Sequence, residues 1–123
     1  MIKIKPKFSL DHYKFSPSTK KQIEPTIKLI EEEQYSAAEK CFAKKAIFLI
    51  KGIDEGRVGP KEADSVFTLL DVYISDNFEV APFDDVLFDL LMEGMILHHY
   101  NDGTDLGPDL NQMEQMARDI LDE

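Results

Sequence analysis

Three carboxylates at regular spacing are the clearest candidates for chemistry in this sequence. Asp85, Asp89 and Glu93 recur every four residues, so on a helix they share one face. Carboxylates in such a row can bind a divalent cation or a basic segment of another protein. Either imidazole of His98 or His99, a few residues later, could add a nitrogen ligand. A solvated acidic helix face is the simpler interpretation.

The two histidines are adjacent, which limits what they can bind together. On a helix their side chains would point about 100° apart, so both could not bind one ion without distortion. No Glu-x-x-His or His-x-x-x-His pairing surrounds them. One histidine with Asp102 or Asp105 is another possible ligand pair. A histidine favoured by the dipole at a helix end is the alternative.

The sequence does not fit the other known patterns of metal-binding and catalytic sites. The loop 101–109 is rich in Asp and Gly, but a calcium-loop template would place Leu106 at a ligand position and Met113 at the glutamate position. The single cysteine, Cys41, lies in an apolar stretch typical of a buried structural thiol, and it cannot form an internal disulfide. The sequence has no phosphate-binding glycine loop, nucleophile elbow or dinucleotide fingerprint. We therefore expect a protein that is not an enzyme, with no catalytic residue, cofactor or metal.

Charge is unevenly distributed along the chain. The sequence has 14 basic and 24 acidic residues, a net charge of −10. Residues 1–21 hold six lysines and one acid, a net charge of +5, whereas residues 22–123 hold eight basic and 23 acidic residues, a net charge of −15. An acidic body repels phosphate backbones, so we expect no nucleic-acid partner. Lys3, Lys5 and Lys7 could bind the chain's own body, a twin subunit or another acidic protein.

The sequence predicts two parts. Residues 1–15 are expected to form a short, basic, extended N-terminal arm, and residues 16–123 an acidic, all-helical domain. Leu10, Tyr13 and Phe15 are expected to anchor the arm.

The stretch from Tyr35 to Glu55 predicts one long helix. Apolar residues recur on one face at three- and four-residue spacing: Tyr35, Ala38, Phe42, Ala46, Leu49 and Ile53. A second apolar side carries Cys41, Ala43, Ile47, Phe48 and Ile50. A helix that is apolar on more than one side needs several neighbours, so we place this helix at the centre of the core.

Four further helices are predicted from periodicity and from proline starts: Pro25–Glu33, Pro60–Asn77, Pro82–Tyr100 and Pro108–Leu121. Gly56 is expected to end the central helix in a left-handed conformation. Asp64, Thr68 and Asp71 are expected to face water. The expected fold is an all-α, single compact bundle of about five helices.

Part of this pattern resembles a known helical repeat. Tyr35, Ala38 and Phe42, after a short helix and a tight turn, resemble the second-helix half of a tetratricopeptide motif. Lys45 stands where that pattern has a small residue, and no second copy follows about 34 residues later. The resemblance therefore implies a helix–turn–helix packing unit and no array of peptide-binding repeats.

These observations predict a class of function. No stretch is long and apolar enough to span a membrane and no secretory signal is present, so we expect no membrane partner. The single cysteine suggests a reducing cytoplasm. We predict a non-catalytic protein-interaction or oligomerisation module with an acidic surface. If the apolar surface exceeds what five helices can cover, the excess must be buried in a homodimer. The alternatives are a metal-binding protein or enzyme using the acidic row with a histidine, and a mimic of nucleic-acid charge that binds a basic protein.

Overall fold

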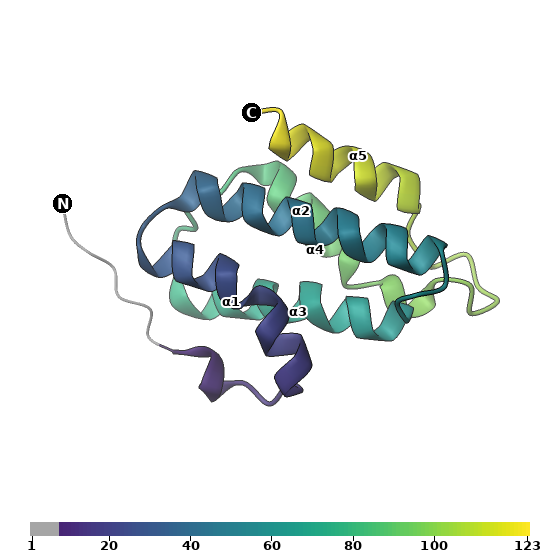
Figure 1. Ribbon diagram of the computed structural model, residues 1–123, viewed down its shortest axis with the longest axis horizontal. Helices are drawn as coiled ribbons and strands as arrows, with labels where there is room; N and C mark the ends of the chain where they lie inside the picture. The colour runs from purple at the N-terminus through teal and green to yellow at the C-terminus, as the bar shows by residue number, and fades with distance from the viewer. Residues whose placement is uncertain (1–7) are drawn as a thin grey trace.

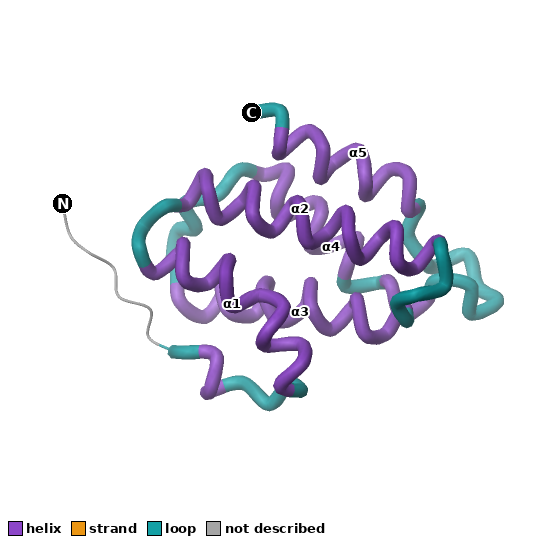
Figure 2. Tube along the Cα trace, viewed as in Figure 1, coloured by secondary structure: helices purple, strands orange, loops and turns teal. Residues whose placement is uncertain are grey.

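The computed structural model describes residues 8–123, and within them it contains helices and loops but no strand (Figure 2). The five α-helices are α1 (Pro17–Glu31), α2 (Tyr35–Asp54), α3 (Pro60–Asn77), α4 (Asp85–Gly94) and α5 (Leu110–Leu121). Two short 3₁₀ helices, η1 (Leu10–His12) and η2 (Leu97–His99), flank α1 and α4. The predicted all-α bundle is confirmed. Lys3, Lys5 and Lys7 lie outside the described residues.

The helices close into a ring around the core. Helix α2 packs against α1 and α5. Helix α4 packs against α5 and α3, and α3 packs against α1, which closes the ring. Helix α2 also contacts α3 across the core. This order places α4 across the bundle from the α1–α2 pair, and in Figure 1 α4 lies behind α2.

Helix α2 is the central helix that the sequence predicts. Phe42, Leu49 and Ile53 are 0%, 1% and 6% exposed, and the ring of Phe42 meets Phe67 of α3 edge-on at 5.3 Å. Burying each such side chain contributes about 1.5–3 kcal/mol. The helix ends before Gly56, which adopts the expected left-handed conformation with φ of 76°. The apolar face of α2 therefore organises the core.

Helix α1 begins earlier than predicted. The prediction of a start at Pro25 is wrong, because the Ser16 side chain accepts the Thr19 N–H at 3.1 Å and Pro17 occupies the first helical position. Pro25 stands inside the helix, where it cannot donate to the Lys21 carbonyl, a cost of about 3 kcal/mol. Buried residues on both sides of it, including the fully buried Ile23, keep the helix in place, and Figure 1 shows α1 bending near its middle.

Helices α4 and α5 are shorter than predicted. Pro82 lies in the preceding loop, and α4 extends only from Asp85 to Gly94. The 3₁₀ helix η2 follows it. Pro108 likewise precedes its helix, because Asp109 is the N-cap and its side chain accepts N–H groups from the first turn of α5. The expected Gly59–Pro60 start of α3 is confirmed.

The end of the N-terminal arm lies against its own chain. The Phe8 N–H donates to Asn77 Oδ1 at 2.7 Å, and the Tyr13 hydroxyl donates to Asp76 Oδ2 at 3.0 Å. Tyr13 is buried, so it anchors this segment to the C-terminal end of α3 as expected.

Among residues 8–123, none of the helices has the length and apolar character that crossing a membrane requires.

We predict that Gly94→Ala destabilises the protein by about 1–3 kcal/mol, because a methyl group there would overlap the fully buried ring of Phe67. Urea unfolding followed by circular dichroism measures this effect. Gly59→Ser is the matched control, since no atom lies near that position and serine is a good N-cap. Equal unfolding midpoints for Gly94→Ala and the original protein would contradict the close packing of α4 on α3.

Candidate functional site

The three predicted carboxylates form an acidic row on the outer face of α4. Asp85 and Asp89 are exposed and Glu93 is half-buried. Met92 lies on the same helical face and is 64% exposed. The outer face of α4 therefore combines a row of negative charge with one flexible apolar side chain. We call these four residues, Asp85, Asp89, Met92 and Glu93, the α4 acidic face.

The structure does not bring the acidic row together with the histidines. Within residues 8–123, no three ligand atoms from Asp85, Asp89, Glu93, His98 and His99 lie within 4.8 Å of one another. Binding of a metal ion by these residues therefore remains a prediction, since the structure does not place their ligand atoms around one point.

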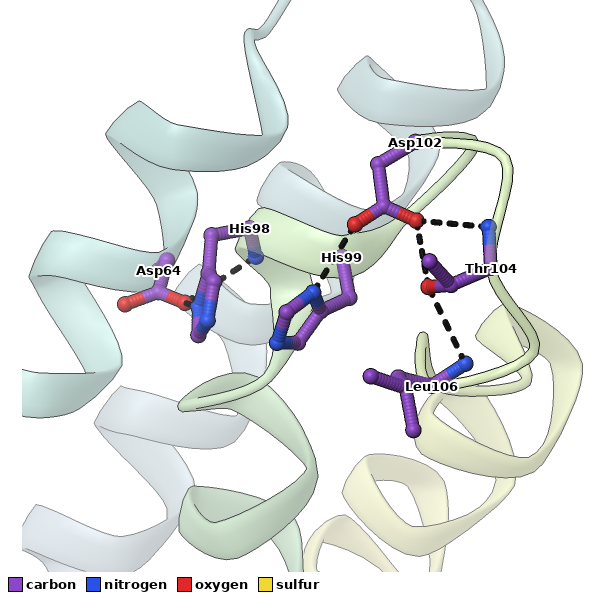
Figure 3. A network of polar contacts seen from close by, with 6 residues as sticks. All are labelled: Asp64, His98, His99, Asp102, Thr104 and Leu106. Atoms are coloured by element: carbon purple, nitrogen blue, oxygen red, sulfur yellow. Dashed lines mark hydrogen bonds and ion pairs between the residues drawn. The ribbon is translucent and has the colours of Figure 1, made fainter.

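Each histidine is instead held by its own carboxylate, as Figure 3 shows. Asp64 Oδ2 accepts the backbone N–H of His98 at 3.0 Å and lies 2.6 Å from its ring Nδ1. The Nδ1 atom of His99 lies 2.8 Å from Asp102 Oδ2. The two rings are 4.1 Å apart between centroids, and the two residues belong to the 3₁₀ helix η2. Each ring nitrogen Nδ1 contacts a different carboxylate, so the structure does not bring the two histidines to one common ligand.

Two aspartates on α3 are less exposed than expected. The side chain of Asp64 is only 15% exposed because η2 packs over it. Asp71 is half-buried, and its burial raises the pKa of its carboxyl. The prediction that Asp64 faces water is therefore wrong, whereas Asp71 and Thr68 remain partly exposed.

Asp102 fixes the loop after η2. Its carboxylate accepts the side-chain hydroxyl of Thr104 at 2.6 Å and the Thr104 N–H at 2.9 Å, in addition to its contact with His99 (Figure 3). These hydrogen bonds, led by the Thr104 hydroxyl, lower the pKa of Asp102 to about 2. The Asp64–His98 and Asp102–His99 pairs thus tie the loop to α3 and to itself.

A second group of carboxylates, which sequence reasoning missed, lies where α2 meets the start of α4. One oxygen each from Glu39, Asp84 and Glu123 lies within 4.8 Å of the others, a donor set of the kind that Ca²⁺ or Mg²⁺ prefers. Glu39 is only 7% exposed, and its Oε2 accepts the Asp84 N–H at 2.8 Å. Lys40 donates to the main-chain oxygen of Glu123, which already places a cation beside the group. These residues are far apart in sequence, so no spacing could have revealed the group.

Burial is the main influence on Glu39. It raises the pKa of the Glu39 carboxyl, the nearby Asp84 carboxylate raises it further, and the hydrogen bond from the Asp84 N–H opposes both. A hydrogen bond with Asp84 is also the largest cause of the raised pKa of Glu123. Glu39 and Glu123 therefore release their protons less readily than ordinary glutamates.

A hollow surface lies between α1 and α2. Two adjoining cavities of about 660 and 730 Å³ share Gln22, Lys45 and Phe48, and we call the combined surface the α1–α2 groove. Its apolar lining includes Pro25, Leu29, Ala37, Cys41 and Phe48. Its lysines are Lys21, Lys40, Lys44 and Lys45.

Phe48 is the most unusual residue of the groove. It is 53% exposed, although it belongs to the second apolar side of α2. The Lys45 ammonium and the Arg57 guanidinium each lie 5.2 Å from its ring centroid, a distance at which cation–π attraction operates. Cys41, farther along the groove, is half-buried, and its sulfur accepts the Thr26 hydroxyl at 3.5 Å. The lining thus presents an aromatic ring framed by cations.

The groove has the opposite charge to most of the protein. Among residues 8–123, its lining contains one acid, Glu62, against four lysines. Residues 58–123 hold Lys61 and Arg118 against 16 acids, a net charge of −14. The sequence predicted an acidic body with a basic arm, and it did not reveal this basic surface, because helix packing brings the lysines of α1 and α2 together.

No protein-family model matches the chain, and the searches of curated proteins and of solved structures likewise found no match.

We predict that Glu39→Gln raises the urea midpoint at neutral pH. Because the pKa of Glu39 is raised in the folded state, this carboxyl favours folding most at low pH, and that contribution is lost as pH rises through its folded pKa. Glutamine keeps an acceptor for the Asp84 N–H without the buried charge. The advantage over the original protein should shrink as pH falls towards about 4.

Glu24→Gln, at an exposed position of α1, is the control and should show little of this pH-dependent difference. A lower midpoint for Glu39→Gln at neutral pH would show that the negative charge of Glu39 stabilises the fold.

Proposed function

We propose that this protein is a non-catalytic protein-interaction module and that the α1–α2 groove is its docking surface. The observation that carries the proposal is the half-exposed Phe48 on an apolar floor with lysines around it. A protein partner can cover the floor with apolar side chains while its carboxylates meet the lysines.

The shape of the groove supports a helical or extended segment as the bound part. A groove between two helices can accept an amphipathic helix, whose apolar residues contact the floor while its polar residues remain at the rim. A central aromatic side chain is a typical source of binding energy at protein interfaces. Phe48 has this position, because it lines both cavities.

The chemistry of the α1–α2 groove favours binding over catalysis. The groove is lined by apolar carbons and ammonium groups, and the Cys41 thiol is engaged by Thr26. A nucleic-acid partner is disfavoured, since the chain carries a net charge of −10 and would repel phosphates at distances beyond the groove.

The proposal predicts contact between a protein and residue 48 inside cells. A photo-crosslinking amino acid placed at Phe48 should form a discrete protein adduct when the chain is expressed in its native cells. Val80, which is 86% exposed in the loop after α3, is the control position and should not form that adduct. Circular dichroism establishes that both variants are folded.

The same crosslinking variant with Lys44→Glu and Lys45→Glu should lose most of the adduct, because the rim charge is reversed. No adduct at position 48, or the same adducts at 48 and 80, would contradict the proposed docking surface.

A further inference from the structure

Resting on the proposed function, we infer that the α1–α2 groove takes the α4 acidic face of a second copy of this chain. The structure holds both halves of this interface, one on each side of the bundle. One half is apolar and basic, and the other is acidic with an exposed methionine.

The α4 acidic face has the chemistry that the groove requires. Asp85, Asp89 and Glu93 make no ion pair with any of residues 8–123, so their charge is available to a partner. Met92 stands among them and is 64% exposed, so this face also presents an apolar side chain to a partner. Methionine sulfur packs favourably on aromatic rings and adapts to irregular surfaces. Phe48 is the exposed ring in the groove.

The spacing of the two surfaces also corresponds. Lys40, Lys44 and Phe48 recur every four residues along α2, as Asp85, Asp89 and Glu93 do along α4. Four residues advance a helix by about 6 Å, so two helices lying along each other keep these rows in register. Lys40 already donates to Glu123, which leaves Lys21, Lys44 and Lys45 as the lysines facing the incoming carboxylates.

The position of the surfaces determines the type of assembly. The groove lies between α1 and α2, whereas α4 packs on α3 and α5 on the other side of the ring of helices, and only the start of α4 approaches α2, beside Glu39. Two copies related by a two-fold axis could not pair both surfaces at once, so association is head-to-tail. The smallest assembly is a dimer that leaves one groove and one α4 acidic face free. Since each copy has a net charge of −10, attraction is local to the contact.

Two charge variants and their mixture test this inference by analytical ultracentrifugation. The groove variant carries Lys44→Glu and Lys45→Glu, and the α4 variant carries Asp89→Asn and Glu93→Gln. All four positions are exposed or half-exposed, so the fold should tolerate them. Asp54→Asn with Asp105→Asn, two exposed acids elsewhere, is the control for the charge change of the α4 variant.

We expect concentration-dependent association of the original protein and of the control, and an increase of about tenfold or more in the dissociation constant for each variant alone. Mixing the two variants should restore a 1:1 dimer and nothing larger. In that mixture, the intact α4 acidic face of the groove variant meets the intact groove of the α4 variant, and the remaining two surfaces do not attract.

A monomeric original protein at every concentration would overturn the inference, as would a mixture that stays monomeric or association that neither variant weakens. If position 48 crosslinks to a different protein while the original chain stays monomeric, the docking surface stands and its assignment to a second copy fails.

Discussion

The structure depends on the need to cover a helix that is apolar on two sides. Helix α2 buries Phe42, Leu49 and Ile53 completely or almost completely against α3, α5 and the rest of the core. On its second side Ala43 and Ile50 are also buried, but Cys41 and Phe48 lie beside α1, where the cover is incomplete. Pro25 lines the groove on the α1 side, and Phe48 of α2 remains half-exposed beside it. The groove is therefore a direct result of how α1 packs on α2.

The distribution of charge follows the same division. Lysines of α1 and α2 surround the groove, whereas the part of the chain from residue 58 onward carries nearly all of the excess negative charge. Several acids in that part hold the fold together: Asp64 and Asp102 each engage a histidine, and Asp109 caps α5. The outer face of α4 is different, because its carboxylates bind no cation among residues 8–123. This contrast is why we assign α4 to intermolecular contact.

The sequence was sufficient to predict the class of fold and the two longest helices. Periodicity placed α2, and the Gly59–Pro60 pair placed the start of α3, since both signals are local. Proline misled in three places, because Pro25 lies within a helix and Pro82 and Pro108 lie before one. Proline fixes its own φ and removes a donor, but it does not decide by itself which side of it is helical.

The functional surfaces were harder to predict because they depend on distant residues. The acidic row on α4 is visible from spacing alone, and the structure places it on one exposed face. The groove requires two helices to lie together, and the Glu39 group requires contact between α2, the start of α4 and Glu123. The histidines show both cases: Asp64, the partner of His98, comes from α3, whereas Asp102, the partner of His99, is only three residues away. Tertiary contacts therefore determine the groove, the Glu39 group and the His98 contact.

Amide chemical-shift mapping of ¹⁵N-labelled protein during dilution identifies the surfaces that separate when copies of the chain dissociate. If the groove binds the α4 acidic face of another copy, the moving resonances should cluster around Lys44 and Phe48 on one side and around Asp89 and Met92 on the other. Buried residues of α3 such as Phe67 should stay fixed. Resonances that do not move, or movement confined to surfaces away from both sites, such as those around Lys61 and Arg118, would contradict the account.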